Sequence, residues 1–223
     1  AIAQAGAFGL FTLSATVTNG LGDGNSLIES SATNLNVPFG ETVVIWRHLS
    51  DASLIDGSYG AGTVITAATG VTTTTVPGTY LPPAKLGRGN YWIAGSTAGQ
   101  NYYGLVNPTA LIAGAVGTAA YTIAAGGGVT PTEAYNIDLK LDDGMPLTGV
   151  VQARGGVAST NTVDATIAGT SAKWSTATAA SAVAGDCVTT GTGASGASSD
   201  TASTYARGAT PGNSPACTLR MRF

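Results

Sequence analysis

Charged side chains are scarce in this sequence. Of its 223 residues, 12 are Asp or Glu and 9 are Lys or Arg, which makes the charged fraction 9% and the formal net charge −3. No acidic or basic residue occurs between Asp56 and Lys85 or between Arg88 and Glu133. Because proteins bind the phosphates of nucleic acids through clustered Lys and Arg, we expect no nucleic-acid partner.

Long hydrophobic runs are also absent. The longest uncharged apolar run covers residues 110–125, and it is too short and too rich in Gly, Ala and Thr to cross a bilayer. We therefore expect no membrane span in this chain. The sequence opens at Ala1 without a Met or a positively charged signal region, and we expect a mature or trimmed chain.

Motifs of catalytic sites are missing as well. His48 is the only histidine, and a single histidine without a neighbouring nucleophile or carboxylate motif is usually structural. The sequence has no nucleophile elbow, HExxH, paired CxxC or phosphate-binding loop. Asp142 and Asp143 are adjacent, whereas a glycosidase pair must face one bond from two sides. We expect that this protein is not an enzyme.

Only two cysteines are present, Cys187 and Cys217, and 30 positions separate them. The loop between them consists mainly of small residues and has almost no apolar anchors of its own. A disulfide would close this loop and contribute about 3–4 kcal/mol on a chain-entropy basis. Two free buried thiols are the alternative. We favour the disulfide and, with it, an oxidising compartment.

The clearest local pattern covers residues 130–153. Thr130 suits a helix N-cap, Pro131 suits the first helical position, and Glu133 completes a capping box. An apolar stripe of Ala134, Ile137 and Leu141 follows at helical spacing. Gly144 is a natural left-handed stop, and residues 148–153 have the composition of a strand.

Asp142 and Asp143 fall in the last turn of this expected helix, where the helix dipole disfavours negative charge. Solvation and hydrogen bonds to the following turn would offset this cost. A cation is the alternative, because oxygen ligands suit a hard ion such as Ca²⁺. Asp138, Asp142 and Asp143 are therefore candidate Ca²⁺ ligands, with Asp186 as a further oxygen donor.

The remaining chain predicts one more helix and several strands. Residues 36–57 have helical spacing, with Ile45, Leu49 and Ala52 on one face and Gly57 at the end. Trp46, Leu49 and Leu54 are expected in the core, and the loop 188–216 is expected to be mostly exposed. Candidate strands are 62–67, 71–76, 90–95, 101–106, a hairpin within 110–125, 161–167, 171–175 and a half-buried final strand at 217–223.

Three ordered stretches carry a resemblance to a protein family. AYNIDLKLDDGMPLTGVVQA (134–153) resembles the C-terminal part of bacterial type IV pilin-like and type II pseudopilin-like proteins. VIWRHLSDASLIDGSYG (44–60) and LPPAKLGRGNYWIAG (81–95) resemble two further segments of that family in the same order, and the closing cysteine pair fits it. The resemblance covers the chain from Gly22 onward. The sequence departs from the family at its start, where the family has a long apolar N-terminal helix with an acidic residue. Residues 1–15 contain two glycines and no acidic residue.

The resemblance implies an α+β fold in which a helix packs on an antiparallel β-sheet, with a β-rich C-terminal part. Residues 1–223 would form one pilin-like globular domain that includes the disulfide-bounded region 187–217. The implied function is that of a structural subunit of an extracellular, bacterial cell-surface filament. Its partners would be copies of itself. The family's N-terminal helix would have been removed, would be supplied by a small separate chain as a further partner, or would have diverged in this sequence. A minor pilin or pseudopilin, and an unrelated β-rich adhesin or phage surface protein, are the alternatives.

Overall fold

A computed structural model describes residues 26–28, 41–60, 76–97, 99–112, 120–123, 128–146, 148–155, 187–189, 204–207, 215 and 217–223 of the chain. Within them lie helices α2 (Glu41–Asp51), η1 (Pro77–Thr79) and α3 (Pro131–Leu141). The strands are β1 (Tyr91–Thr97), β2 (Gln100–Val106), β3 (Pro108–Ile112), β4 (Ala120–Ile123), β5 (Val151–Gly155), β6 (Val188–Thr189), β7 (Thr204–Tyr205) and β8 (Cys217–Arg222). The predicted α+β content and antiparallel sheet are confirmed.

Helix α3 begins where its capping residues predict. The Thr130 side chain accepts a hydrogen bond from the Glu133 amide at 3.2 Å, and the Glu133 carboxylate accepts from the Thr130 amide at 2.9 Å. Arg88 pairs with the same carboxylate at 2.5 Å, which ties the start of α3 to the turn before β1. Two otherwise unsatisfied backbone donors are thus paired, and the start of the helix is well defined.

Helix α2 is shorter than predicted and buries a different face. The helix ends at Asp51 and not at Gly57, where the end was predicted. Asp51 forms an ion pair with Arg47, one turn earlier, at an N–O distance of 2.7 Å. Its buried side chains are those of Thr42, Val43, Val44 and Trp46. The predicted stripe of Ile45, Leu49 and Ala52 is wrong as the main buried face, because Ala52 is exposed and the other two are half-buried.

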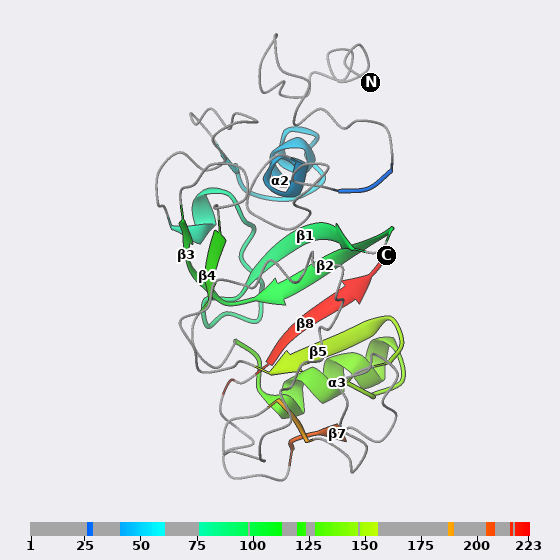
Figure 1. Ribbon diagram of the computed structural model, residues 1–223. Coiled ribbons are helices and arrows are strands. Elements are labelled where there is room, and N and C mark those ends of the chain that lie inside the picture. The colour runs from blue at the N-terminus through cyan, green and yellow to red at the C-terminus, as the bar shows by residue number, and fades with distance from the viewer. Residues whose placement is uncertain are drawn as a thin grey trace.

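The main sheet has four antiparallel strands in the order β1-β2-β8-β5. Strands β1 and β2 form a hairpin in which Thr97 pairs with Gln100. Strand β8 comes last in the chain and lies between β2 and β5, so that Leu219 pairs with both Leu105 and Ala153. Figure 1 shows this order from β1 to β5, with the red β8 between green neighbours. The hairpin predicted within residues 110–125 is confirmed as β3–β4.

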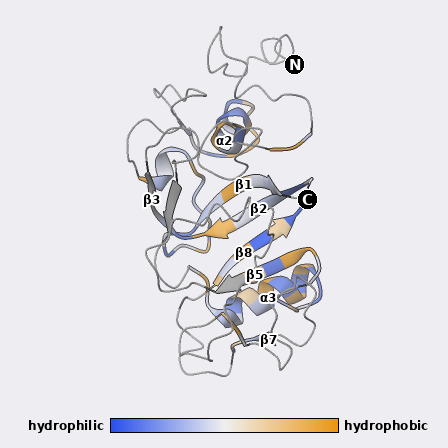
Figure 2. Ribbon diagram, viewed as in Figure 1, coloured by the Kyte–Doolittle hydropathy of each residue, from blue (hydrophilic) through white to orange (hydrophobic). Residues whose placement is uncertain are grey.

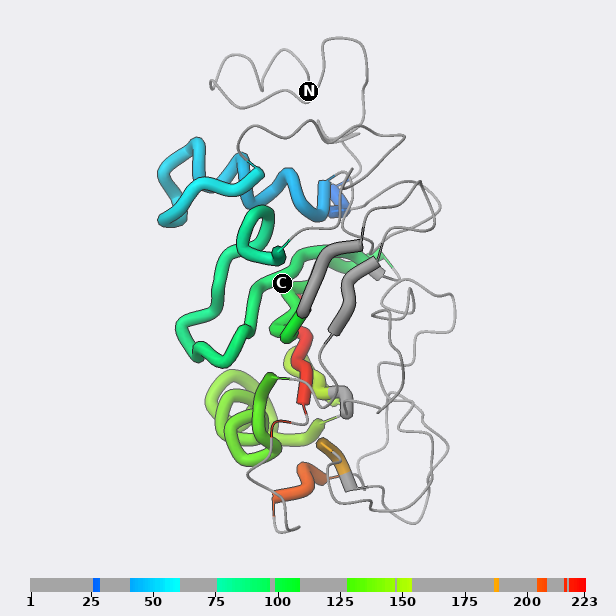
Figure 3. The backbone as a smooth tube through the Cα atoms, turned by 90° about the vertical axis from the view of Figure 1, so that its left-hand side faces the viewer, coloured from blue at the N-terminus to red at the C-terminus, as the bar shows by residue number. Residues whose placement is uncertain are grey.

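Helices α2 and α3 lie on the same side of this sheet (Figure 3). Trp46 of α2 contacts Tyr103 with ring centroids 6.1 Å apart, and Ile137 of α3 packs against the cluster around Leu219. Trp92 is partly buried against the clusters under both helices and so connects them. The side chains between the helices and the sheet form one part of the core, and Ile93 and Val106 are buried on the opposite face of the sheet.

The first four residues of β8 are buried on both faces, which differs from the predicted half-buried pattern, while Met221 is half-buried and Arg222 is exposed. Leu219 and Arg220, on opposite faces, are exposed by only 0% and 6%. Gln152 on β5 accepts hydrogen bonds from the Arg220 guanidinium, which lies 4.7 Å from the Tyr102 ring on β2. Figure 2 shows hydrophilic and hydrophobic positions alternating along β8. Burial lowers the pKa of Arg220 to about 10, which leaves the guanidinium charged at neutral pH.

Cys187 and Cys217 are joined by a disulfide with an S–S distance of 1.99 Å, and both are fully buried. The bond joins Cys187, which directly precedes β6, to the first residue of β8. Val188, Tyr205 and Ala206 are also buried, so these described parts of loop 188–216 do not follow the predicted exposure.

Leu54 was expected in the core, yet it is 71% exposed, because it follows the end of α2. The predicted burial of Trp46 is confirmed, while Leu49 is half-buried. Among the described residues, none of the helices is both long and apolar enough to cross a membrane. The expectations for residues 1–15 and the strands predicted at 62–67, 161–167 and 171–175 lie outside the described residues. The same holds for the strand predicted at 71–76 except Val76, which is not in a strand.

Candidate functional site

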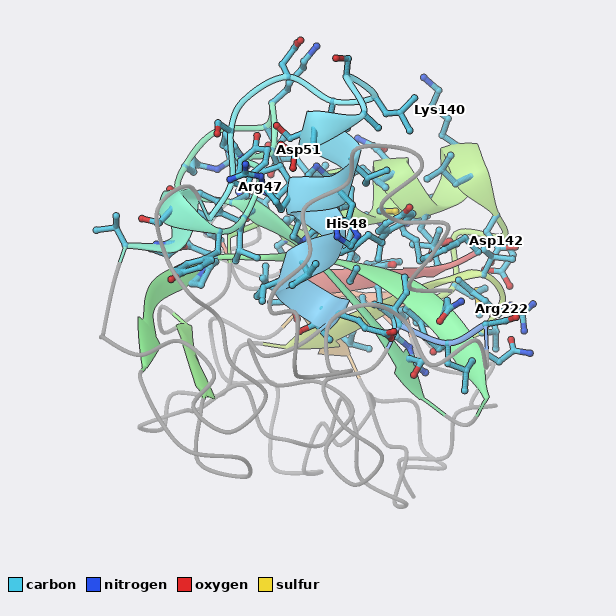
Figure 4. All side chains as sticks on the ribbon, turned by 90° about the horizontal axis from the view of Figure 1, so that it is seen from above. Arg47, His48, Asp51, Lys140, Asp142 and Arg222 are labelled. Carbon is cyan, nitrogen blue, oxygen red and sulfur yellow. A yellow bond between two sulfur atoms is a disulfide. The ribbon has the colours of Figure 1, made fainter. Side chains whose placement is uncertain are left out.

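Three aspartates gather where α3 ends and the chain turns into β5. Asp138 lies in the last turn of α3, and Asp142 and Asp143 directly follow its final residue, Leu141. Gly144 has a φ of 73° and carries the chain away from the helix axis, as its position predicted. Figure 4 shows Asp142 at this end of α3, with Lys140 pointing away from it. We call the segment from Asp138 to Val151 the acidic turn.

Asp142 connects the end of the helix to the start of the strand. Its Oδ2 atom accepts hydrogen bonds from the amides of Val150 and Val151, the latter at 3.2 Å. Gly149 is packed so closely beneath this carboxylate that a Cβ atom there would collide with it. Gly149 also has a φ of 72°, a conformation that L side chains rarely adopt. The position therefore requires glycine for two independent reasons.

Asp143 organises the turn that follows. Its Oδ1 atom accepts from the Met145 amide at 2.8 Å, and its Oδ2 atom accepts from the Thr148 hydroxyl at 2.7 Å. A side chain that binds its own backbone two residues on is the usual way in which Asp stabilises a turn. The predicted role of Asp142 and Asp143 in organising the turn agrees with these contacts.

Asp138 is fully buried and faces the disulfide-bounded region. It accepts a hydrogen bond from the Tyr205 hydroxyl at 2.7 Å and another from the Gly144 amide at 3.2 Å. Burial raises the pKa of the Asp138 carboxyl to about 6; the two hydrogen bonds oppose the rise, and the negative charges of Asp143 and Asp142 add to it. Burial and the bond to Asp138 also raise the pKa of Tyr205, so its hydroxyl stays protonated as the donor.

The three carboxylates can be brought to one cation. Each offers an oxygen atom, and these atoms lie within 4.8 Å of one another. Both oxygens of Asp138 and Asp143 and one oxygen of Asp142 already accept protein hydrogen bonds. The turn is thus formed by protein donors alone, while each carboxylate oxygen retains acceptor capacity for a hard ion such as Ca²⁺. Asp186, the further predicted oxygen donor, lies outside the described residues.

Sequence reasoning missed two partners of this cluster. Thr148 was placed in a strand, although its spacing of five residues from Asp143 is typical of a turn contact. Tyr205 is separated from Asp138 by 67 positions, and nothing in the local sequence indicates that they meet. Its ring also meets Tyr135 edge-on at a centroid distance of 6.0 Å, while Arg207 lies 3.7 Å from the Tyr135 ring centre. These contacts fasten the described part of the loop to α3.

Comparisons of this chain with protein-family models, with curated proteins and with solved structures found no match.

We expect Gly149→Ala to lower the free energy of unfolding more than Gly87→Ala does. Both glycines have a φ above 70°, so each alanine carries a cost of about 1–2 kcal/mol for the left-handed conformation. A Cβ at Gly87 meets nothing within 4 Å, whereas one at Gly149 displaces the Asp142 carboxylate. The added loss should be about 1–3 kcal/mol, because two amides lose their acceptor. Chemical denaturation measures both, and equal losses would contradict the assigned contact.

The contribution of Asp138 to the free energy of unfolding should fall as pH rises through about 6. The folded pKa is raised from 3.8 to about 6, so this contribution is fully present below 3.8 and is lost as the buried carboxyl ionises. Its size should be on the order of 2 kcal/mol. Asp138→Asn should flatten this part of the stability profile between pH 4 and pH 7. A variant with an unchanged profile in urea titrations would show that another group is responsible.

Calcium binding by Asp138, Asp142 and Asp143 makes a separate prediction. Millimolar CaCl₂ should raise the melting temperature of the unaltered chain, because a ligand that binds only the folded state stabilises it. Asp143→Asn should remove this rise. Elemental analysis should find calcium in the protein before chelation. If a chelator leaves the melting temperature unchanged and no calcium is found, the acidic turn is organised by hydrogen bonds alone.

Proposed function

We propose that this protein is a structural subunit of an extracellular pilus-like filament that acts by polymerisation and surface display. The observation that carries the proposal is the buried disulfide from Cys187 to Cys217, which ties the C-terminal loop to the central strand β8. Such bonds persist in oxidising compartments and are rare in reducing ones. A disulfide at this position is therefore compatible with a protein that is displayed outside the cell.

The arrangement of helix and sheet supports the same proposal. The resemblance implies a helix packed on an antiparallel sheet, with a disulfide-bounded C-terminal part. Helix α2 over β1, strand β8 in the middle of the sheet and the disulfide at its start are compatible with that expectation. Many unrelated functions share α+β folds, so the fold adds weight only together with the ordered motifs.

The distribution of charge supports assembly with copies of the same chain. Long stretches between Asp56 and Lys85 and between Arg88 and Glu133 carry no charged residue. Subunits with few charges approach one another without the large desolvation cost of burying ions. The assembly would display adhesive, motility-related or secretion-related surfaces, and we assign it no catalytic role.

Two alternatives share part of this support. A minor pilin or a type II secretion pseudopilin would have the same fold but make short assemblies. An unrelated β-rich surface adhesin or phage surface protein would also carry the disulfide, since it too meets an oxidising environment. Abundance in filaments separates these possibilities.

The test is to shear appendages from the surface of the source cells and to quantify this chain by mass spectrometry. We expect it to be a main component of the filaments, and deletion of its gene should remove them. Trace amounts in filaments that persist after deletion would favour a minor subunit. Recovery from the cell surface without any filament would overturn the proposal in favour of an adhesin.

The purified 223-residue chain should behave differently from the filament. We expect a soluble monomer or small oligomer in sedimentation and electron microscopy, because residues 1–15 would span only about 22 Å if they were fully helical. Assembly would then need a helix from a preceding part of the protein or from a small separate partner chain. Long ordered filaments formed by the purified chain alone would show that the spine lies within this sequence.

A further inference from the structure

A groove of about 740 Å³ opens on the helix-covered side of the sheet. It lies between α3, the segment after α2 and the turn before β1. Its walls are mostly apolar and include Ile55, Trp92, Leu105, Ile137, Leu141 and Met221. Among its described lining residues, only Asp56 and Lys85 carry charge, and the two are opposite in sign. The groove thus offers an apolar surface with no net charge.

Part of this apolar surface faces solvent. Leu141 and Leu86 line the groove and are 59% and 37% exposed. Apolar surface that is contiguous and exposed often marks a binding site, because covering it releases about 25 cal/mol per Å². A suitable occupant is therefore an uncharged segment with several large apolar side chains.

The chain itself contains such a segment. Residues 1–15 carry no charge and include Ile2, Phe8, Leu10, Phe11 and Leu13. Gly6 and Gly9 weaken a helix by about 1 kcal/mol each, so the segment gains little stability from its own backbone. Its apolar side chains need a surface to cover them, and the groove has the matching chemistry.

The attachment point of this segment lies on the same side of the sheet as the groove. Asn101 donates to the Ser26 carbonyl and accepts from the Ile28 amide, both at 2.9 Å. Side chains alternate along β2, so Asn101 shares its face with Leu105, which lines the groove. The groove residue Met221 pairs with Tyr103, about 7 Å along β2 from Asn101.

The connecting residues are long enough to join the two places. Residues 16–25 can span up to about 35 Å when extended. The distance from Asn101 to the nearest part of the groove is a small fraction of that span. The segment can thus reach the groove of its own chain without any rearrangement of the described elements.

We propose that residues 1–15 dock into this groove of the same chain. The docked segment covers the apolar walls formed by α3 and the turn before β1. In a filament subunit, this contact would keep the segment covered until another helix replaces it, but the docking does not rest on the filament proposal.

Photo-cross-linking in the full-length chain tests the docking. Phe11 is replaced by benzoylphenylalanine, the purified protein is irradiated, and the cross-linked peptides are identified by mass spectrometry. We expect cross-links to the groove walls, within residues 82–86 and 137–141. A 1:1 mixture of ¹⁴N- and ¹⁵N-labelled chains should give only cross-links within one isotope. Cross-links between isotopes would assign the segment to a second copy, and cross-links elsewhere or none at all would overturn the proposal.

Two variants of one helix provide a matched control. Leu141→Glu places a charge in the groove wall and should lower the cross-link yield by about tenfold or more, the effect of about 1.4 kcal/mol. Leu139 is exposed to a similar extent, 52%, but does not line the groove, so Leu139→Glu should leave the yield unchanged. Circular dichroism checks that both variants fold. Equal yields in the two variants would contradict docking at this groove.

Discussion

Backbone pairing of β8 on both of its edges is the interaction on which the described structure depends. The β1–β2 hairpin with α2 forms one part, and β5 with α3 forms another. Strand β8 supplies the hydrogen bonds that join them, with Leu105 and Ala153 both opposite Leu219. Without β8, the buried edges of β2 and β5 would face each other without a ladder, and their polar groups would need other partners.

Two further contacts stabilise β8 in this position. The disulfide joins its first residue, Cys217, to Cys187, which directly precedes β6. Cys217 also exchanges backbone hydrogen bonds with Val129, just before α3. On the opposite face of the sheet, the Arg220 guanidinium donates a hydrogen bond to Gln152 on β5 and lies over the Tyr102 ring on β2. One charged side chain thus contacts both neighbouring strands. A buried ion of this kind is costly unless its hydrogen bonds are made, which favours one register of the sheet over its alternatives.

Local features of the sequence could be predicted, and contacts across long distances could not. The capping box of Thr130 and Glu133 and the left-handed Gly144 depend on residues a few positions apart, and both are confirmed. The prediction of the buried face of α2 was wrong. Helical spacing favoured Ile45, Leu49 and Ala52, whereas Trp46, which contacts Tyr103, and its neighbours are the residues buried. In the acidic turn, the three aspartates were identified, but Tyr205 was not, since its position follows from the disulfide and from α3 together.

The order in which the strands of the main sheet are synthesised affects folding on the ribosome, because β8 follows both of its neighbours in the sequence. Sixty-two positions separate Gly155, the last residue of β5, from Cys217, the first of β8. At ribosomal rates of about 5–20 residues per second, β8 emerges about 3–12 s after β5. During that interval the edges of β2 and β5 are open to strands of other nascent chains, a known route to aggregation. A cell that makes this protein therefore benefits from holding the chain unfolded until its final strand has been synthesised.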